Sequence, residues 1–308
     1  MPAPRTSAVE LFAGCGGSAV GLRSLDIEVV ALFERDARVV ATLHANGFSG
    51  VICADVNDVD FRPFRGVDIV SGGPPCQPFS IGGMHRGAAD ERDGWGAAVR
   101  AVAEIGPALF IFENAAAFAG ESHREYREAL ERRFRHLGYA TRTVVTDAQF
   151  HAVPQVRRRS LLLGFKDRAA LARFTEPVPL APSSLRAAIA DLGTPLQSER
   201  DWPRQHALHT ASAKPYKGHT PSLLDSPAKT VVAGVHGVPG GANCVRLDDG
   251  SMRYFTIREA LRVQGFPDDF HFPNNVSWSA IFRQVGNAAP PALIARYAQA
   301  QLAATAAS

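Results

Sequence analysis

The chain has 308 residues, of which 46% are hydrophobic and 20% charged, a mixture typical of a soluble globular protein with a sizeable core. No apolar run is long enough to cross a bilayer and no secretory signal starts at Met1, so the sequence indicates a cytoplasmic protein without a membrane partner. The formal net charge of +3 is a mild bias toward polyanions and does not identify a partner by itself.

Two compositional features narrow the chemistry further. Only four of the 33 basic residues are lysines, and arginine suits bidentate contacts with phosphates and bases. A GC-rich genome explains the same bias equally well. The four cysteines, Cys15, Cys53, Cys76 and Cys244, lie far apart without CxxC pairs or zinc-ligand spacing, which indicates free thiols and no metal site.

The first half of the chain alternates short apolar strands with helical segments. Strands are expected at 7–14, 27–34, just before Asp55, 66–73 and 107–115, with helices at 18–26, 35–47, 94–106 and 124–138. Residues 139–148 and 159–165 are expected to form an antiparallel pair. This order predicts an α/β fold with a doubly wound, mostly parallel sheet, which binds ligands beyond the carboxyl ends of its strands.

The composition of the sequence changes between about residues 168 and 253. Pro, Gly, Ser, His and Thr become frequent there and amphipathic helices are scarce, which indicates a second, smaller and loop-rich domain. Regular helical patterning returns at 255–266 and 290–304.

A Gly-rich turn follows the first strand in "ELFAGCGGSAVG", residues 10–21. Such a turn lets a ligand approach the backbone at a helix N-terminus, although a tight turn that packs a helix on a strand has the same pattern. The next strand ends in Glu34, an acceptor for ribose hydroxyls, and Asp55 follows the third. Because G-C-G-G lacks the G-x-G-x-x-G spacing of a pyrophosphate grip, S-adenosylmethionine fits better than NAD.

Three reactive residue types stand at the ends of later strands. Cys76 is fixed between prolines in "GGPPCQPFS", Glu113 and Asn114 end the strand at 107–115, and three arginines precede the strand at 159–165. Taken singly, a buried thiol, a helix cap and a solvated basic face explain them. Their common position at strand ends favours a reactive site instead, with alternate arginines facing the same way.

These segments together resemble the DNA cytosine-5 methyltransferase family of bacteria and phages. The similar segments are "FAGCGG", "PPCQPFS", "FEN", "QVRRR", "REALRVQGFPDDF" and the closing "RQVGNAAPP". The resemblance implies a Rossmann-like fold that binds S-adenosylmethionine, with no metal, and covers most of the chain apart from the loop-rich stretch.

The resemblance also implies catalytic roles. Cys76 would attack C6 of a cytosine flipped out of duplex DNA, so that C5 can accept the methyl group. Glu113 would bind N3 and the exocyclic amine, while Arg159 would hold the O2 carbonyl and Arg157 would support the loop or phosphates.

The implied cofactor contacts follow the first motifs and the closing motif. Phe12 would pack on the adenine, the Gly14 and Gly16 backbone would approach the ligand, Glu34 would hold the ribose and Asp55 the adenine amine, with Pro75 lining the pocket and Asn287 near the methionine end.

Because the closing motif must return to the catalytic domain, that domain is expected at 1–181 and 276–308, with a target-recognition domain at 182–275. Candidate DNA contacts are Ser80, Gln155, Thr230, His236, Arg246 and Arg253, and ordinary loop residues are an equal alternative for the last four. The expected protein is a monomer that acts on double-stranded DNA, with a restriction endonuclease as a further member of the same system but not in a stable complex.

The sequence departs from the family pattern at three positions. Ala115 replaces the usual Val beside the base pocket, Glu10 replaces the usual Asp, and Arg35 stands where some members carry a bulky apolar residue against the adenine. None of these changes removes a reacting group.

Three other functions remain alternatives. An RNA cytosine methyltransferase would share the fold, a catalytically silent DNA-binding regulator would share the surface, and a nicotinamide oxidoreductase would share the sheet. The intact Cys76, Glu113 and Arg159 disfavour a silent binder. Assays with tRNA beside duplex DNA, and titration with NAD beside S-adenosylmethionine, distinguish the others.

Overall fold

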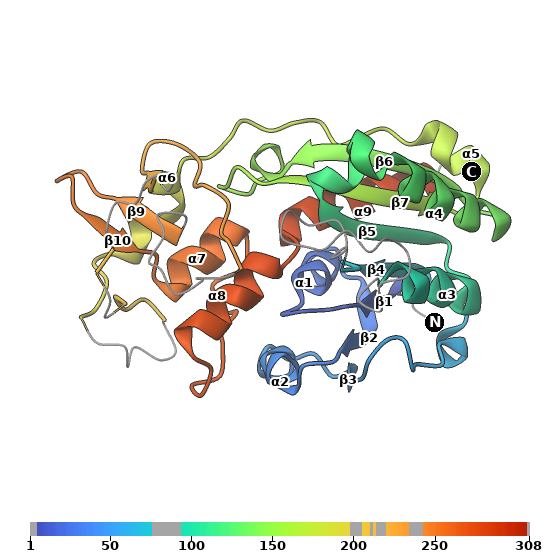
Figure 1. Ribbon diagram of the computed structural model, residues 1–308, viewed down its shortest axis with the longest axis horizontal. Coiled ribbons are helices and arrows are strands. Elements are labelled where there is room, and N and C mark those ends of the chain that lie inside the picture. Colours follow the sequence, from blue (N-terminus) through green and yellow to red (C-terminus); the bar gives the residue numbers. More distant parts are fainter. Residues whose placement is uncertain are drawn as a thin grey trace.

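The computed structural model describes residues 5–75, 94–197, 205–209, 212–213, 220–233 and 243–306. Its main feature is a seven-stranded sheet in the order β3-β2-β1-β4-β5-β7-β6 (Figure 1). The strands are β1 (Ser7–Leu11), β2 (Glu28–Glu34), β3 (Val51–Cys53), β4 (Ile69–Gly72), β5 (Leu109–Ala115), β6 (Ala140–Asp147) and β7 (Arg158–Phe165). The first five are parallel, and β7 lies antiparallel between β5 and β6, so both the parallel sheet and the antiparallel pair predicted from the sequence are confirmed.

Helices cover both faces of this sheet. One face carries α3 (Trp95–Ile105) and α4 (Arg124–His136), and the other carries α1 (Gly17–Arg23), α5 (Arg168–Arg173) and α9 (Pro291–Ala306), with α2 (Ala37–Ala45) beside α1. The inner strands are therefore buried on both sides and read as continuous apolar runs; Leu109 to Phe112 in β5 are all buried.

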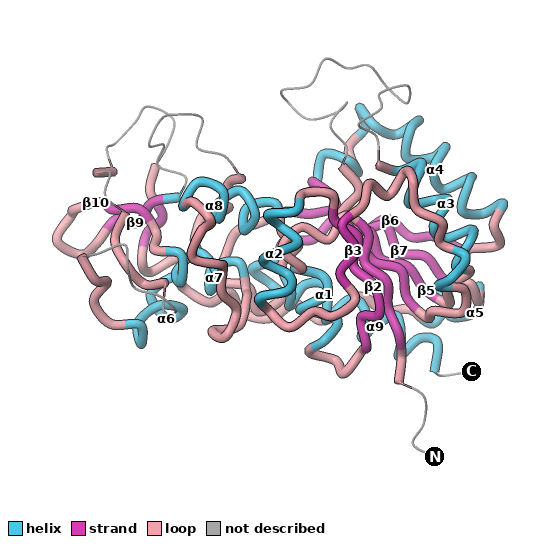
Figure 2. Tube along the Cα trace, turned by 90° about the horizontal axis from the view of Figure 1, so that it is seen from below, coloured by secondary structure: helices cyan, strands magenta, loops and turns pink. Residues whose placement is uncertain are grey.

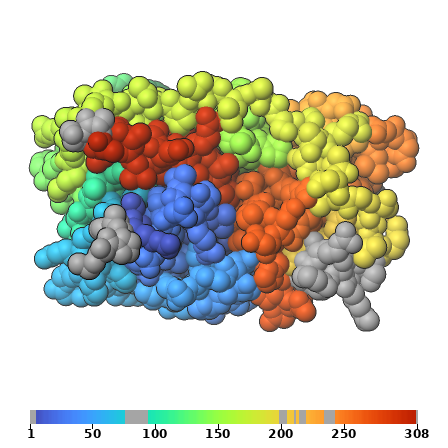
Figure 3. All heavy atoms as spheres, turned by 180° about the vertical axis from the view of Figure 1, so that it is seen from behind, coloured from blue at the N-terminus to red at the C-terminus, as the bar shows by residue number. Residues whose placement is uncertain are grey.

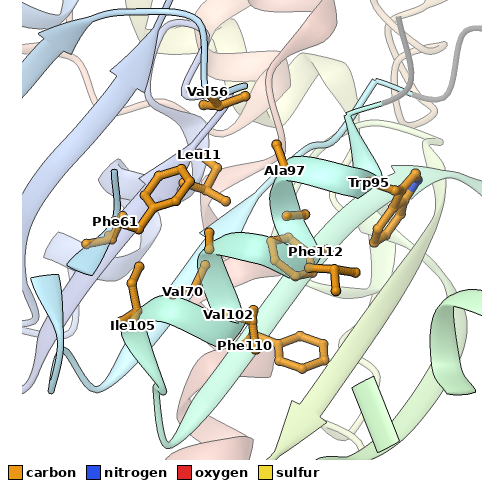
Figure 4. Close-up of a cluster of buried hydrophobic side chains, with 14 of the residues drawn as sticks. Leu11, Val56, Phe61, Val70, Trp95, Ala97, Val102, Ile105, Phe110 and Phe112 are labelled. Carbon is orange, nitrogen blue, oxygen red and sulfur yellow. The ribbon is translucent and has the colours of Figure 1, made fainter. Parts of the chain in front are cut away.

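An aromatic-rich cluster fills the space between α3, α4 and the sheet. The ring centroids of Trp95 and Phe112, both labelled in Figure 4, lie 5.7 Å apart. The ring centroids of Phe110 and Phe134 lie 4.4 Å apart. Each of these four side chains is fully buried. This cluster anchors α3, which follows the proline-rich segment, against the strands that end at the site.

The C-terminal helix returns to the first half of the chain. Figure 3 shows this red segment lying against the blue N-terminal residues, with the yellow-green segment along its other side. The helices α1 and α9 approach each other closely, since a Cβ on Gly21 would come within 2.3 Å of the Pro291 carbonyl oxygen. Part of the Gly-rich motif therefore serves helix packing, the alternative considered from the sequence.

A second region, in which loops predominate among the described residues, lies beside the sheet (Figure 2). It contains α6 (Leu185–Ile189), α7 (Ile257–Gln264), α8 (Trp278–Asn287) and a small sheet of β8 (Ser222–Leu223), β9 (Cys244–Arg246) and β10 (Met252–Tyr254). The start of α7 is set locally, since Thr256 and Glu259 form a reciprocal capping box, and it ends at Gly265 with φ 88°.

The apolar core of this second region includes residues from α8 as well as from α7. Ile281, Phe282 and Val285 of α8 pack in the same cluster as Leu185 and Phe255. The same cluster includes Cys15 from the turn after β1, so α8 packs where the two regions meet, and the boundary predicted between residues 275 and 276 stays a prediction. No described helix is long and apolar enough to cross a membrane.

Candidate active site

A cavity of about 500 Å³ opens at the carboxyl ends of the parallel strands, where the sequence places its motifs. Its walls come from the ends of β1, β2, β4 and β5, the segment after β3, the start of β7 and the end of α8. Nine residues expected at the site from the sequence line it: Phe12, Gly14, Glu34, Asp55, Pro75, Glu113, Arg157, Arg159 and Asn287.

The turn after β1 has an unusual backbone. Phe12 has φ 54° and Gly14 has φ 51°, both in the left-handed region that non-glycine residues rarely adopt. Glu34 fixes this turn from the end of β2, because its Oε2 accepts a hydrogen bond from the Gly14 amide at 3.0 Å. Its other oxygen accepts from the Asp36 amide at 2.9 Å, so the carboxylate is firmly oriented beside the cavity.

Gly16 has a different place from the other expected cofactor residues. It is the N-cap of α1 with φ 86°, and an added Cβ would lie 2.9 Å from the Leu43 side chain. It does not line the cavity, so the structure supports a role for Gly16 in the turn and the helix start rather than at a ligand.

The acidic residue after β3 is held by its own turn. Asp55 Oδ1 accepts from the Asn57 amide at 2.9 Å, and Arg35 Nη1 lies 3.7 Å from Asp55 Oδ2. The second oxygen of Asp55 therefore has only a loose partner and remains suited to bind an amino group at this end of the cavity.

Glu10 also lines the cavity, although the sequence indicated it only as a departure from the family pattern. Burial raises the pKa of its carboxyl to about 8, against hydrogen bonds from Ala19 and Ser18 that lower it. The side chain is consequently largely neutral at neutral pH. Its Oε2 has no hydrogen-bond partner among the described residues, which leaves a polar atom at the cavity wall.

The opposite end of the cavity brings the reactive motifs together. Glu113, at the end of β5, lies with its Oε1 2.6 Å from Nε of Arg159 on the neighbouring β7, and Glu113 is only 8% exposed. Asn114 donates through Nδ2 to the Pro74 carbonyl oxygen at 2.9 Å. This bond holds the proline turn that leads directly to Cys76, which lies outside the described residues together with Ser80.

Arg157 and Arg159 both face the cavity, as expected for alternate residues entering a strand. The two arginines differ in burial. Arg157 is 1% exposed, and its guanidinium donates to the carbonyl oxygens of Val231, Gly286 and Ala288 at 3.2, 2.7 and 3.1 Å. Burial lowers its pKa to about 9, with a contribution from the Arg159 charge. Through these bonds Arg157 links the closing motif, at Gly286 and Ala288, to the second region, at Val231.

The structure does not support direct DNA contact by Gln155, which was expected from its motif. Gln155 is fully buried, and its Nε2 donates to the Val263 carbonyl at 3.0 Å and to Gln264 Oε1 at 2.8 Å. Its Oε1 accepts from the Val231 amide at 2.9 Å. All of these partners lie inside the protein, so Gln155 joins the arginine motif to α7.

The other candidate DNA contacts that the structure describes, Thr230, Arg246 and Arg253, do not line the cavity. Thr230 donates to the Val156 carbonyl at 2.7 Å, next to the arginine motif. Arg253 is paired with both carboxylate oxygens of Glu259 at 2.6 Å, so its guanidinium is already engaged. Arg246 is exposed on β9, and His236 lies outside the described residues.

The fold and the site together define the class. A strand order of β3-β2-β1-β4-β5-β7-β6, with an antiparallel β7 and an acid at the end of β2, is that of S-adenosylmethionine-dependent methyltransferases. The crystal structure of a Spodoptera frugiperda DNMT2 mutant has the same fold, with a TM-score of 0.74 over 96% of this chain and 99% of that chain, at 16% identity.

Comparison of sequences identifies the family. Residues 6–302 match the C-5 cytosine-specific DNA methylase family. Type II methyltransferase M.AplI of Arthrospira platensis is 30% identical, over 92% of this chain and 82% of its own length. Type II methyltransferase M.NgoMIV of Neisseria gonorrhoeae is also 30% identical, over 92% of this chain and 93% of its own. The chain therefore belongs to the C-5 cytosine-specific DNA methylases and is a DNA cytosine-5 methyltransferase.

Proposed function

We propose that this protein transfers a methyl group from S-adenosylmethionine to C5 of a flipped-out cytosine within a short, specific sequence of duplex DNA, through a covalent bond between Cys76 and C6. The observation that carries the proposal is the contact between Glu113 and Arg159 at the edge of the cavity that Pro75 also lines. An acid and a guanidinium on adjacent strands suit the N3 and O2 edge of one cytosine.

S-adenosylmethionine would supply an electrophilic methyl group at the wall between the two ends of the cavity. Glu34, fixed by two backbone amides, would accept from the ribose hydroxyls, and Asp55 would accept from the adenine amine. Phe12 would pack on the adenine, while Gly14 would give the ligand access to the backbone. Asn287 and the unpartnered oxygen of Glu10 lie on the wall available to a polar methionine end.

The residues of the chain would divide the chemistry as follows. The Cys76 thiolate adds to C6, and the electron pair that this addition places at C5 attacks the methyl group. Glu113 holds the proton at N3 and accepts from the exocyclic amine, and Arg159 donates to O2, so both offset the charge that develops on the ring. Methyl transfer would break the bond between the methyl carbon and the cofactor sulfur and leave S-adenosylhomocysteine. A solvent base would then take the C5 proton, and the electron pair of that C–H bond would re-form the C5–C6 double bond, expel the thiolate and restore the aromatic base.

Two buried side chains would keep this geometry without touching the base. Asn114 holds the Pro74 carbonyl immediately before the nucleophile, and Arg157 holds the closing motif against β7. The thiol and the base need close alignment because small displacements cost large factors in rate.

The partners follow from this chemistry. The substrate is double-stranded DNA, read by the second region, and a restriction endonuclease that cuts the same sequence is the expected companion in the cell. The protein is expected to act as a monomer in the cytoplasm, since one chain carries both the reactive groups and the cofactor cavity.

Base-resolution methylation sequencing tests the proposal directly. Plasmid from cells that express the protein should carry 5-methylcytosine at one short motif, and plasmid from cells with the Cys76→Ala variant should not. Glu113→Gln should slow methylation by about 10²-fold or more, since the acid's proton is lost. Unmodified plasmid from soluble protein that binds S-adenosylmethionine, or substantial methylation by Cys76→Ala, would contradict the proposal.

A further inference from the structure

One side chain on α3 holds the segment that follows β3. Arg100 donates through Nη2 to the carbonyl oxygens of Val56 and Asn57, at 2.6 and 3.0 Å, and through Nη1 to the carbonyl oxygen of Val59. Three carbonyls of one short loop therefore converge on one guanidinium. A cation with several fixed donors meets this arrangement better than any neutral side chain.

A residue on the next turn of α3 also holds the segment that follows β3. Glu104 Oε2 accepts from the Phe61 amide at 2.8 Å, and the Arg100 guanidinium lies 5.0 Å from the centre of the Phe61 ring. Val56 and Phe61 are both buried on the sheet side of this loop, close to α3 (Figure 4). Residues 56–61 are thus fixed on one side by apolar packing and on the other by two side chains one helical turn apart.

Asn57 connects the hydrogen bonds of Arg100 to the wall of the cofactor cavity. Arg100 holds the carbonyl of Asn57, and the amide of Asn57 donates to Asp55 Oδ1 at 2.9 Å. The Asp58 amide donates to the Asp55 carbonyl at 3.0 Å and closes the turn. The direction of the Asp55 carboxylate, and the position of the Val56 and Asn57 part of the cavity wall, therefore depend on where Arg100 holds the loop.

We propose that Arg100 is a positioning residue for the adenosine end of the cofactor: it pre-organises the loop from Asp55 to Val59 without touching the ligand. The proposal rests on the proposed function, in which Asp55 binds the adenine amine. Because α3 directly follows the segment that contains the nucleophile, the same helix would fix one wall of the adenosine site and one end of the reactive segment.

A loop that is already fixed binds a ligand more tightly than a free one, because its backbone loses no further conformational entropy on binding. Without the guanidinium, three carbonyls lose their shared donor, and the loop keeps its own turn, the apolar packing of Val56 and Phe61, and the Phe61 amide contact. We expect binding of an adenosine ligand to weaken about tenfold, on the scale of one lost hydrogen bond to a charged group.

Calorimetric titration with S-adenosylhomocysteine tests the proposal on the purified full chain. The variants are Arg100→Met, Arg100→Lys and the control Arg62→Met. Arg62 follows residues 56–61 in the chain and pairs with Asp60 on the surface, with 70% of its side chain exposed. Arg62→Met therefore removes the same charge as Arg100→Met without removing the three carbonyl contacts. Arg100→Met should raise Kd about tenfold, Arg100→Lys should recover part of the loss, and Arg62→Met should match the wild type.

Two further readings separate positioning from a general loss of structure. In steady-state kinetics, Arg100→Met should raise KM for S-adenosylmethionine while kcat and KM for DNA stay near their wild-type values. Hydrogen exchange in the ligand-free protein should become faster at residues 56–61 and remain unchanged in β1, β4 and β5.

The outcomes distinguish the two proposals. A wild-type protein that does not bind S-adenosylhomocysteine would overturn the proposed function itself. Wild-type binding together with an unchanged Kd for Arg100→Met, or an equal loss for Arg62→Met, would overturn only the role of Arg100. If Arg100→Met does not fold, Arg100→Gln takes its place, and a wild-type Kd for that variant with unchanged exchange at 56–61 also overturns it.

Discussion

The two regions of the molecule are held together by different means. In the large sheet, backbone ladders set the register of seven strands, and aromatic side chains such as Trp95 and Phe112 fill the space beneath. In the second region the strands have only two or three residues each. Hydrogen bonds from side chains to the backbone hold segments together there in place of strand pairing. Asn243, for example, exchanges two hydrogen bonds with the Val232 backbone, at 3.0 and 3.2 Å.

Further side-chain bonds of this kind recur throughout the second region. Gln205 donates to the Phe272 carbonyl at 3.0 Å, and His206 contacts the Thr256 hydroxyl at 2.9 Å between their Nδ1 and Oγ1 atoms. An amide ladder tolerates changes of side chain, whereas a buried amide side chain cannot be replaced without leaving polar groups unpaired. The sheet should therefore be most sensitive to lost volume, and the second region to lost hydrogen bonds.

The largest effect is expected in the sheet core. Phe112→Ala should lower the free energy of unfolding by about 3–5 kcal/mol, because a fully buried ring that touches Trp95 and Phe134 leaves a cavity. Chemical denaturation measures this, with Val145→Ala as a control: Val145 is 44% exposed and its change should stay within about 0.5 kcal/mol. Equal losses for both variants would remove the contrast between core and surface.

A smaller and more local effect is expected at the join between the regions. Gln155→Leu should destabilise the protein by about 1–3 kcal/mol, since the Val231 amide and the Val263 carbonyl lose their partner inside the protein. Hydrogen exchange should become faster in α7 while β1 and β5 keep their protection.

A double-mutant cycle sharpens this prediction. Because Gln155 and Gln264 bond to each other, Gln264→Leu and Gln155→Leu together should cost less than the sum of the single changes, by about 0.5 kcal/mol or more. If Gln155→Leu instead weakens DNA binding with no change in stability or exchange, direct DNA contact by this residue would be restored as the explanation.

The smallest effect is expected at the surface of the second region. Arg186 bonds to Asp225 and Asp248, whose side chains are 80% and 72% exposed, and 42% of its own side chain is exposed. Arg186→Met should leave the thermal unfolding midpoint unchanged at physiological salt, because solvent and ions screen such pairs. Thermal scans at low and high salt measure this, and a large loss that persists at high salt would show that ion pairs, and not buried amides, hold this region.

The success of the sequence-based interpretation follows the same division. The inner strands β1, β4 and β5 were predictable because residues buried on both faces leave continuous apolar runs. The five-residue α6 and the ten-residue α8 were missed. The helix α6 is too short to show an amphipathic repeat. The helix α8 is longer than α2 and α7, which were predicted, and its buried Ile281, Phe282 and Val285 do follow helical spacing, so its pattern and its Ser277 cap were signals that could have identified it.

The sequence predicted the residues of the candidate site better than it predicted their roles. The position of Glu34, Asp55 and Glu113 at strand ends follows from the alternation of strands and helices. Gln155 was misplaced because a polar residue in a motif gives no sign of burial in the sequence. Arg100 was not noticed at all, since its partners are backbone carbonyls about forty residues away and such partners leave no trace in the chain.

The sequence by itself thus determined the order of strands and helices, the family motifs and the strand ends at which candidate residues stand, because apolar periodicity and local turn chemistry act over a few residues. Only the tertiary structure decided which polar residues face the cavity and which are consumed inside the protein. Arg157 and Arg159 are two positions apart in the sequence, yet one is enclosed by carbonyls of distant segments and the other meets Glu113. Burial is a property of the packed chain, and it separates a supporting residue from a reacting one.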